Sequence, residues 1–170
     1  MRVLYIYMPR VPLRYVPKQL TRRDKGRARR ELNLSRKLYK QKQYHTRKKV
    51  GSFHSKTSKH ILKARKIYGV DKIMPTPILA KKTGCSLSAL EHIVKKGEGA
   101  YFSSGSRPNQ TAQSWGYARL ASSITGGKAS AVDYGILEKG CTKKSKALHL
   151  AKQSMYYKTH GRHSVPTVAL

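Results

Sequence analysis

The sequence predicts an all-α fold, in which a small helical domain with a helix-turn-helix-like unit follows an extended basic N-terminal arm. Between residues 58 and 157, apolar residues recur three and four positions apart, bounded by capping residues and glycines, as on one face of a helix. The first 57 residues are rich in Lys and Arg and show this spacing in one segment alone. We therefore expect an arm over residues 1–57, a helical domain over 58–157 and a tail over 158–170.

The arm is expected to be extended except for one helix. Pro9, Pro12 and Pro17 fix φ and lack an amide hydrogen, which favours an extended segment over residues 1–20. Thr21 and Asp24 have the spacing of a capping box, so a helix should begin there. Residues 40–60 have no period and predict a basic loop.

Two helices joined by a short turn are the most specific feature of the domain. Ser58 can cap a first short helix that ends at Gly69. Thr76 and Pro77 then form a strong helix start, Gly84 supplies a turn, and Ser86 caps the next helix, which is expected to end at Gly97. This spacing is typical of a helix-turn-helix, although helical hairpins that bind no DNA share it.

A long Gly/Ser loop is expected over residues 97–111, where backbone amides beside Arg107 would form an anion-binding nest. Asn109 or Thr111 caps a helix after this loop. A helix around residues 129–139 is closed by Gly140, and a last basic helix covers about 142–157.

The charge of the chain points to a polyanionic partner. Lys and Arg number 37 against seven Asp and Glu, a formal net charge of +30. These cations cannot be neutralised within the molecule, so counter-charge must come from nucleic acid, an acidic protein surface or an anionic membrane. Leu, Ile, Val and Phe make up 34 of 170 residues, near the level at which highly charged chains stop folding alone, so partners are expected to supply order.

The candidate polyanion-binding residues are the cations of the arm and the polar face of the second helix of the helix-turn-helix-like unit. They are Arg22, Arg23, Lys25, Arg27, Arg29, Arg30, Arg47, Lys48, Lys49, Ser88, His92, Lys95, Lys96 and Arg107.

The sequence contains no known catalytic or metal-binding pattern. The acids form no tight pair of the kind that holds a catalytic cation, and the Cys and His spacings match no compact zinc site. We expect no catalytic residue, cofactor, metal site or small-molecule substrate. Cys85 and Cys141 suit a reducing compartment, and a structural disulfide between them is not expected. Either cysteine could form a nucleophile pair with a histidine that is distant in the sequence. Sequence spacing does not test such a pair, and no residue pattern supports one.

One tract resembles an uncharacterised domain family of large eukaryotic DNA viruses, with looser relatives in tailed phages. It comprises Gly-Ala-Tyr-Phe-Ser-Ser-Gly-Ser-Arg-Pro-Asn-Gln-Thr from Gly99, Ser-Trp-Gly-Tyr-Ala-Arg-Leu-Ala-Ser from Ser114, Gly-Gly-Lys-Ala from Gly126 and Val132-Asp133. The resemblance covers about residues 75–141 and extends less closely to the arm from Met8. It implies a viral source and carries no catalytic residues.

Two functions remain open at this point. The first is a non-enzymatic virion protein, a minor capsid protein that bridges capsid subunits on the inner face of a large icosahedral DNA virus. Its partners would be capsid proteins, with nucleic acid or an inner membrane surface as further contacts. The second is a DNA-binding helix-turn-helix protein that acts in packaging or transcription of the viral genome. Either protein would reside in the virion, or in the host cytoplasm or nucleus during assembly.

Overall fold

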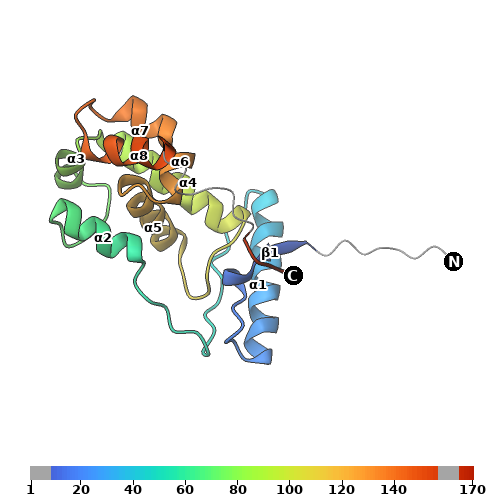
Figure 1. Cartoon of the computed structure of the whole chain (residues 1–170). Helices are drawn as coiled ribbons and strands as arrows, with labels where there is room; N and C mark the ends of the chain where they lie inside the picture. Colours follow the sequence, from blue (N-terminus) through green and yellow to red (C-terminus); the bar gives the residue numbers. More distant parts are fainter. Residues whose placement is uncertain (1–8, 157–164) are drawn as a thin grey trace. The chain divides into compact units, whose positions relative to one another are not determined.

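A computed structural model describes residues 9–156 and 165–170, and within these ranges it contains eight α-helices, one short 3-10 helix and two short strands (Figure 1). The predicted all-α class is confirmed. The elements are β1 (Arg10–Pro12), the 3-10 helix η1 (Leu13–Tyr15), α1 (Arg22–Lys40), α2 (Lys59–Tyr68), α3 (Pro77–Thr83), α4 (Leu87–Ser103), α5 (Ala112–Ile124), α6 (Lys128–Val132), α7 (Tyr134–Gly140), α8 (Lys146–Tyr156) and β2 (Thr167–Ala169). None of the helices in the described part of the chain is long and apolar enough to cross a membrane.

The chain forms two compact units, which differ from the predicted arm, domain and tail. Among the described residues, the first unit comprises residues 9–55, 102–110 and 165–170, and the second comprises 56–101 and 111–156. Three separate stretches of sequence thus build the first unit. The expectations for residues 1–8 and 158–164 lie outside the described residues.

The first unit joins segments that were expected to form an extended arm with one helix, and a separate tail. Strand β1 pairs antiparallel with β2, so that Val11 lies opposite Val168. The Nε of Arg29 on α1 donates a hydrogen bond of 3.1 Å to the carbonyl of Ala169, which ties the helix to this sheet. A small core lies inside the unit: Val11, Tyr15, Val16, Leu20, Ala28, Leu32 and Val50. This core could not be predicted from the sequence, because its few residues come from separate segments that share no hydrophobic period.

Helix α1 begins where predicted, but its first acid has a different role. The Thr21 Oγ1 accepts a hydrogen bond of 3.2 Å from the Asp24 amide, as an N-cap should. The Asp24 carboxylate does not complete a capping box. Its Oδ2 instead accepts bonds from the Ser52 amide (2.9 Å) and the Ser52 hydroxyl (2.6 Å). The side chain therefore fastens the loop after α1 back onto the start of the helix.

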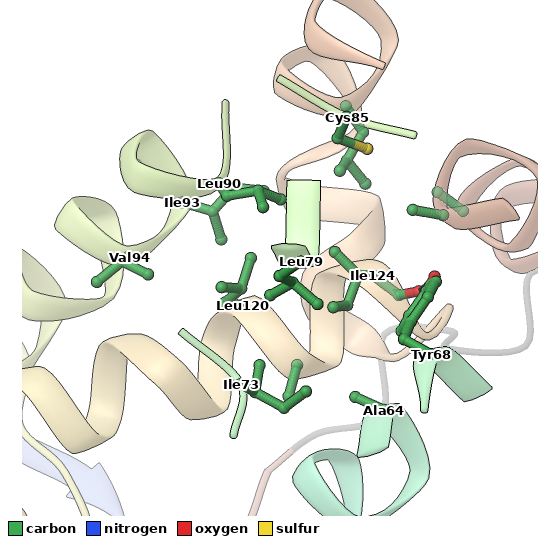
Figure 2. Packing of buried hydrophobic residues seen from close by; sticks show 14 of the residues in the cluster. Ala64, Tyr68, Ile73, Leu79, Cys85, Leu90, Ile93, Val94, Leu120 and Ile124 are labelled. Carbon is green, nitrogen blue, oxygen red and sulfur yellow. Dashed lines mark hydrogen bonds between the residues drawn. The ribbon is translucent and has the colours of Figure 1, made fainter. Parts of the chain in front are cut away.

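In the second unit, the capping residues place the first helices as expected. Ser58 caps α2, and Gly69 ends it with a left-handed φ of 60°. Thr76 caps α3, and Gly84 ends that helix with a φ of 71°. Apolar side chains from α2, α3, α4 and α5 meet in one core, which Figure 2 shows around Leu79, Leu120 and Ile124. The predicted pair of helices α3 and α4 is present in the fold.

Gly97 does not end α4, contrary to the prediction. The helix continues to Ser103, and Gly97 lies where α4 crosses α5. A Cβ atom added to Gly97 would come within 2.6 Å of the Cα of Gly116 on α5. Glycine is therefore needed here for close helix packing and not for a turn. The Gly/Ser loop predicted over residues 97–111 is therefore shorter and covers residues 104–111. Thr111 forms a capping box with Ser114 at the start of α5.

The expected helix over residues 129–139 is two helices, α6 and α7, which meet at Asp133. The Asp133 carboxylate is fully buried and binds side chains of α4 and α5, as described below. The break places this acid inside the unit, where one continuous helix had been expected.

Cys85 and Cys141 form a disulfide, so the expectation that they would not be bridged was wrong. Backbone hydrogen bonds bring the two segments together: the Ser86 amide donates to the Gly140 carbonyl (2.7 Å) and the Thr142 amide to the Gly84 carbonyl (2.9 Å). The cysteines are 56 positions apart, so their spacing gave no sign of this contact. With the two paired, the cysteine count supplies no argument for a reducing compartment.

Removal of the disulfide should destabilise the second unit. A Cys85→Ser and Cys141→Ser double variant opens a covalent loop whose closure contributes roughly 4 kcal/mol to the free energy of unfolding in the chain-entropy model. Denaturant unfolding, followed by the fluorescence of Trp115 on α5, measures this loss. Reductant should lower the midpoint of the wild type and leave that of the double variant unchanged. A wild type indifferent to reductant would contradict the prediction.

The crossing of α4 and α5 should not tolerate a methyl group. Gly97→Ala is expected to cost about 1–3 kcal/mol, because the added Cβ overlaps the Gly116 backbone. Gly135→Ala on α7 is the matched control: apart from its chain neighbours and the backbone of its own helix, no atom lies within 4 Å of the added Cβ, so the better helix propensity of alanine should stabilise by up to about 1 kcal/mol. Denaturation midpoints of both variants test the contrast, and equal effects would contradict it.

Candidate polyanion-binding surfaces

Helix α1 separates the predicted basic residues into exposed and partly buried ones. Arg22, Arg23 and Arg30 are exposed. Lys25, Arg27 and Arg29 are partly buried, and Arg29 binds the carbonyl of Ala169. Arg22 and Arg23 stand in the first turn, where the helix dipole disfavours cations by roughly 0.3–1 kcal/mol each. The helix dipole therefore does not explain their position, although Arg23 also attracts the Asp24 carboxylate and helps to lower its pKa.

The loop after α1 is held against the helix by Glu31. Its Oε2 accepts a hydrogen bond from the Lys48 amide (2.9 Å) and lies 2.9 Å from the Nε2 of His45. Partial burial raises the pKa of Glu31, but these hydrogen bonds and charges outweigh it and hold the pKa below its ordinary value. The carboxylate thus stays charged while it positions a loop on which Lys48 and Lys49 are exposed.

Arg47 has a structural role that its residue type did not reveal. Its Nη1 donates to the Ser35 hydroxyl (3.1 Å) and its Nη2 to the Ser106 hydroxyl (2.6 Å). The guanidinium therefore joins α1 to residues 104–110 within the first unit. Of the predicted cations of this loop, Lys48 and Lys49 remain directed at solvent.

The loop that begins at residue 104 is held within the first unit by the side chain of Asn109. The Asn109 side chain accepts from the Val50 amide (2.8 Å) and donates to the carbonyls of Val50 (3.0 Å) and Phe53 (2.7 Å). Gly105, with a φ of 123°, lies so close to Leu32 and Tyr15 that a Cβ would overlap them. Arg107 is exposed and lines a hollow of about 470 Å³ together with Arg14 and Lys18.

In the second unit, the predicted face of α4 is only partly free. Ser88, His92 and Lys95 are exposed. The Lys96 Nζ lies 3.1 Å from the Asp133 Oδ1 and forms an ion pair with it. Ser88, His92 and Lys96 line a hollow of about 500 Å³, whose other wall is formed by α6 and α7 and includes Lys139. Glu91 is also exposed on α4, which weakens the positive charge of this face.

Asp133 joins α4, α5 and the break between α6 and α7. The Arg119 guanidinium binds it through two hydrogen bonds of 2.9 and 2.7 Å, and the Ser123 hydroxyl donates a third of 2.7 Å. Burial alone raises the pKa of Asp133, yet hydrogen bonds from Arg119, Ser123 and Lys96 outweigh it and lower the pKa from 3.8. Arg119 was not among the predicted residues, because no pattern around it marks it as the partner of an acid 14 positions away.

Two arrangements used in catalysis, a metal-binding cluster and a free thiol, are absent from residues 9–156 and 165–170. These ranges hold no group of three His, Cys, Asp or Glu side chains placed to bind a metal ion. Both cysteines of the chain are in the disulfide, so a Cys–His nucleophile pair has no thiol in this structure. These surfaces present exposed Lys and Arg side chains, which can bind anions.

The fold and its surfaces define a small, strongly basic all-α protein. The chain belongs to a family of unknown function (DUF5824), whose model matches residues 12–148. The match spans both units and includes the tract that resembled an uncharacterised domain family. No curated protein and no solved structure matches the sequence.

Neutralising Asp133 should destabilise the second unit and change its response to acid. Asp133→Asn leaves Arg119 and Lys96 without their counter-charge, which should cost about 3 kcal/mol at pH 7. Because folding lowers this pKa, the ionised carboxylate stabilises the fold above about pH 4, and the contribution is lost as the pH falls through the lower folded-state pKa.

Thermal or denaturant unfolding of the second unit, followed by Trp115 fluorescence between pH 2 and 7, tests this. The difference between wild type and Asp133→Asn should shrink as the pH falls below 4. Glu138→Gln, on the same helix segment, is the control, because Glu138 bonds only to Tyr134 among the described contacts. A loss that does not depend on pH would contradict the role given to the charge.

Proposed function

We propose that this chain is a non-enzymatic nucleic-acid-binding protein of a large DNA virus, which neutralises phosphates through the exposed cations of the first unit. The viral source comes from the sequence resemblance. The family itself supplies no function, so the proposal depends on the charge and its placement.

The observation that carries the proposal is the imbalance of charge in the first unit. Residues 9–55, 102–110 and 165–170, which form it, hold 17 Lys and Arg but only two acids, Asp24 and Glu31. Both acids are used inside the unit, where Asp24 binds Ser52 and Glu31 binds the loop at Lys48. The outward-facing cations therefore need an external counter-charge, and phosphates spaced along a nucleic acid supply one at high density.

The first expectation, a minor capsid protein that bridges subunits, depended on an extended arm. Residues 9–55 fold instead around a core of their own and pair with β2. The architecture thus favours a compact basic surface over an arm that spans neighbouring subunits. Mass spectrometry of purified particles opened at graded salt separates the two functions: release with DNA favours nucleic-acid binding, and release with the shell after nuclease treatment favours the capsid role.

Sequence-specific reading of bases by α4 has less support than phosphate binding. A recognition helix must enter the major groove with its first turns. Here the first turn of α4 lies against the end of α7: a Cβ atom added to Gly140 would overlap Ala89, and the Ser86 amide, just before α4, donates to the Gly140 carbonyl. Lys96 is paired with Asp133, and Glu91 adds a negative charge to the face. We therefore propose contacts to phosphates that are independent of sequence.

Binding of a 20-base-pair duplex, measured by fluorescence anisotropy over a series of KCl concentrations, tests the proposal. A plot of log affinity against log salt should fall steeply. The combined Arg22→Gln and Arg23→Gln variant should reduce the slope by about 0.9 for each phosphate that the protein no longer neutralises. The fold should survive, because both residues are exposed and their repulsion from the dipole of α1 is lost together with the attraction of Arg23 for Asp24.

The matched control is the combined Lys81→Gln and Lys82→Gln variant, which removes the same charge from exposed positions on α3 of the second unit. It should change the slope less. Absence of duplex binding at low salt would refute the proposed function. Equal effects of the two variants would refute the assignment of binding to α1.

A further inference from the structure

Three aromatic rings gather where α1 ends, within the first unit. We call Tyr39, Tyr44 and Phe102 the aromatic cluster. The rings of Tyr39 and Phe102 are nearly parallel, at 8°, with centroids 6.4 Å apart. The Tyr44 ring meets both edge to face, with centroids 6.2 Å from Tyr39 and 5.1 Å from Phe102.

Tyr44 is largely open to solvent although it touches two other aromatic rings. Its exposed fraction is 72 %, while Tyr39 and Phe102 are half-buried. Edge-to-face contacts at 60° leave ring surface of Tyr44 uncovered. The exposed ring of Tyr44 therefore packs on the partly buried rings of Tyr39 and Phe102. Nothing in the first unit's own fold requires the Tyr44 ring to be exposed.

The backbone holds Tyr44 in this position from both sides. After α1, the Lys42 amide donates to the Tyr39 carbonyl and the Gln43 amide to the Leu38 carbonyl, both at 2.9 Å. Lys42 has a φ of 59°, which is uncommon for a residue with a side chain and reverses the chain toward the helix. His45, the next residue after Tyr44, is fixed by Glu31. The aromatic surface is thus pre-positioned and costs little ordering on binding.

The charged residues that surround Tyr39 and Tyr44 in the sequence are all cations. Residues 32–70 contain 12 Lys and Arg and no Asp or Glu. Lys37, Lys40 and Lys42 are exposed on the last turn of α1 and in the turn that follows. Aromatic rings flanked by cations are the combination with which proteins bind single strands, because bases stack on the rings while phosphates meet the cations.

We propose that the aromatic cluster binds an unpaired base of a single-stranded nucleic acid, which stacks on Tyr44 while the flanking phosphates contact Lys37, Lys40 and Lys42. The inference builds on the proposed function and adds a preference for single strands. A base inside a duplex is already stacked on its neighbours and has no face to offer to Tyr44. The preference should depend little on sequence, since every base has an aromatic face.

The test compares two probes on the full-length protein: a fluorescein-labelled 12-mer of thymidine and a 12-base-pair duplex, both by anisotropy at fixed salt. Tyr44→Ala should weaken binding of the single strand about tenfold, as loss of one stacked base does, and leave duplex binding unchanged within about twofold. Tyr44→Trp should retain single-strand binding, and its fluorescence should change when the strand is added by more than that of the wild type, in which Trp115 is the only tryptophan.

Tyr156→Ala is the control, because Tyr156 is also exposed, at 81 %, but belongs to the second unit. It should bind both probes like the wild type. If neither probe binds the wild type, the proposed function itself fails. If both bind and Tyr44→Ala weakens neither, or weakens both equally, phosphate binding stands and the stacking site is refuted. Binding of a proline-rich peptide to the cluster in place of the single strand would also refute it.

Discussion

Repulsion among like charges is the constraint under which this protein folds, because 37 cations share the chain with seven acids. Three of the seven acids hold segments of the fold together through hydrogen bonds and ion pairs. Asp24 and Glu31 hold the loop after α1 against the helix, and Asp133 joins α4 and α5 to the break between α6 and α7. In each case hydrogen bonds to amides, hydroxyls or guanidinium groups keep the pKa of the acid low, so the negative charge persists where it is needed. The acids thus stabilise the fold locally and leave the outer surfaces positive.

The parts of the fold that depend on neighbouring residues could be predicted from the sequence, and those that depend on distant residues could not. Ser58, Thr76 and Thr111 cap helices as expected, because a cap acts within three residues. Gly97 misled the prediction, since only the position of Gly116 explains why a glycine is needed there. The disulfide and the pairing of β1 with β2 likewise join segments far apart in the sequence.

The same distinction applies to the candidate site. Composition identified the cations, and Arg22, Arg23, Lys48 and Lys49 are exposed as a binding role requires. Residue type could not show that Arg47 and Lys96 bind Ser106 and Asp133 within the fold. Nor did it single out Tyr44, because its neighbour Phe102 comes from a segment 58 positions further along the chain, and the ring contacts exist only after folding.

The pairing of β1 with β2 also sets the order in which the protein can fold during synthesis. Arg10 and Thr167 are 157 positions apart, so the first unit cannot close its sheet until the ribosome has added the residues of β2. The residues of the second unit between positions 56 and 156 are complete earlier and can pack around their own core. For most of its synthesis the nascent chain therefore carries an unpaired strand and a basic helix α1 beside the ribosome, itself a dense array of phosphates.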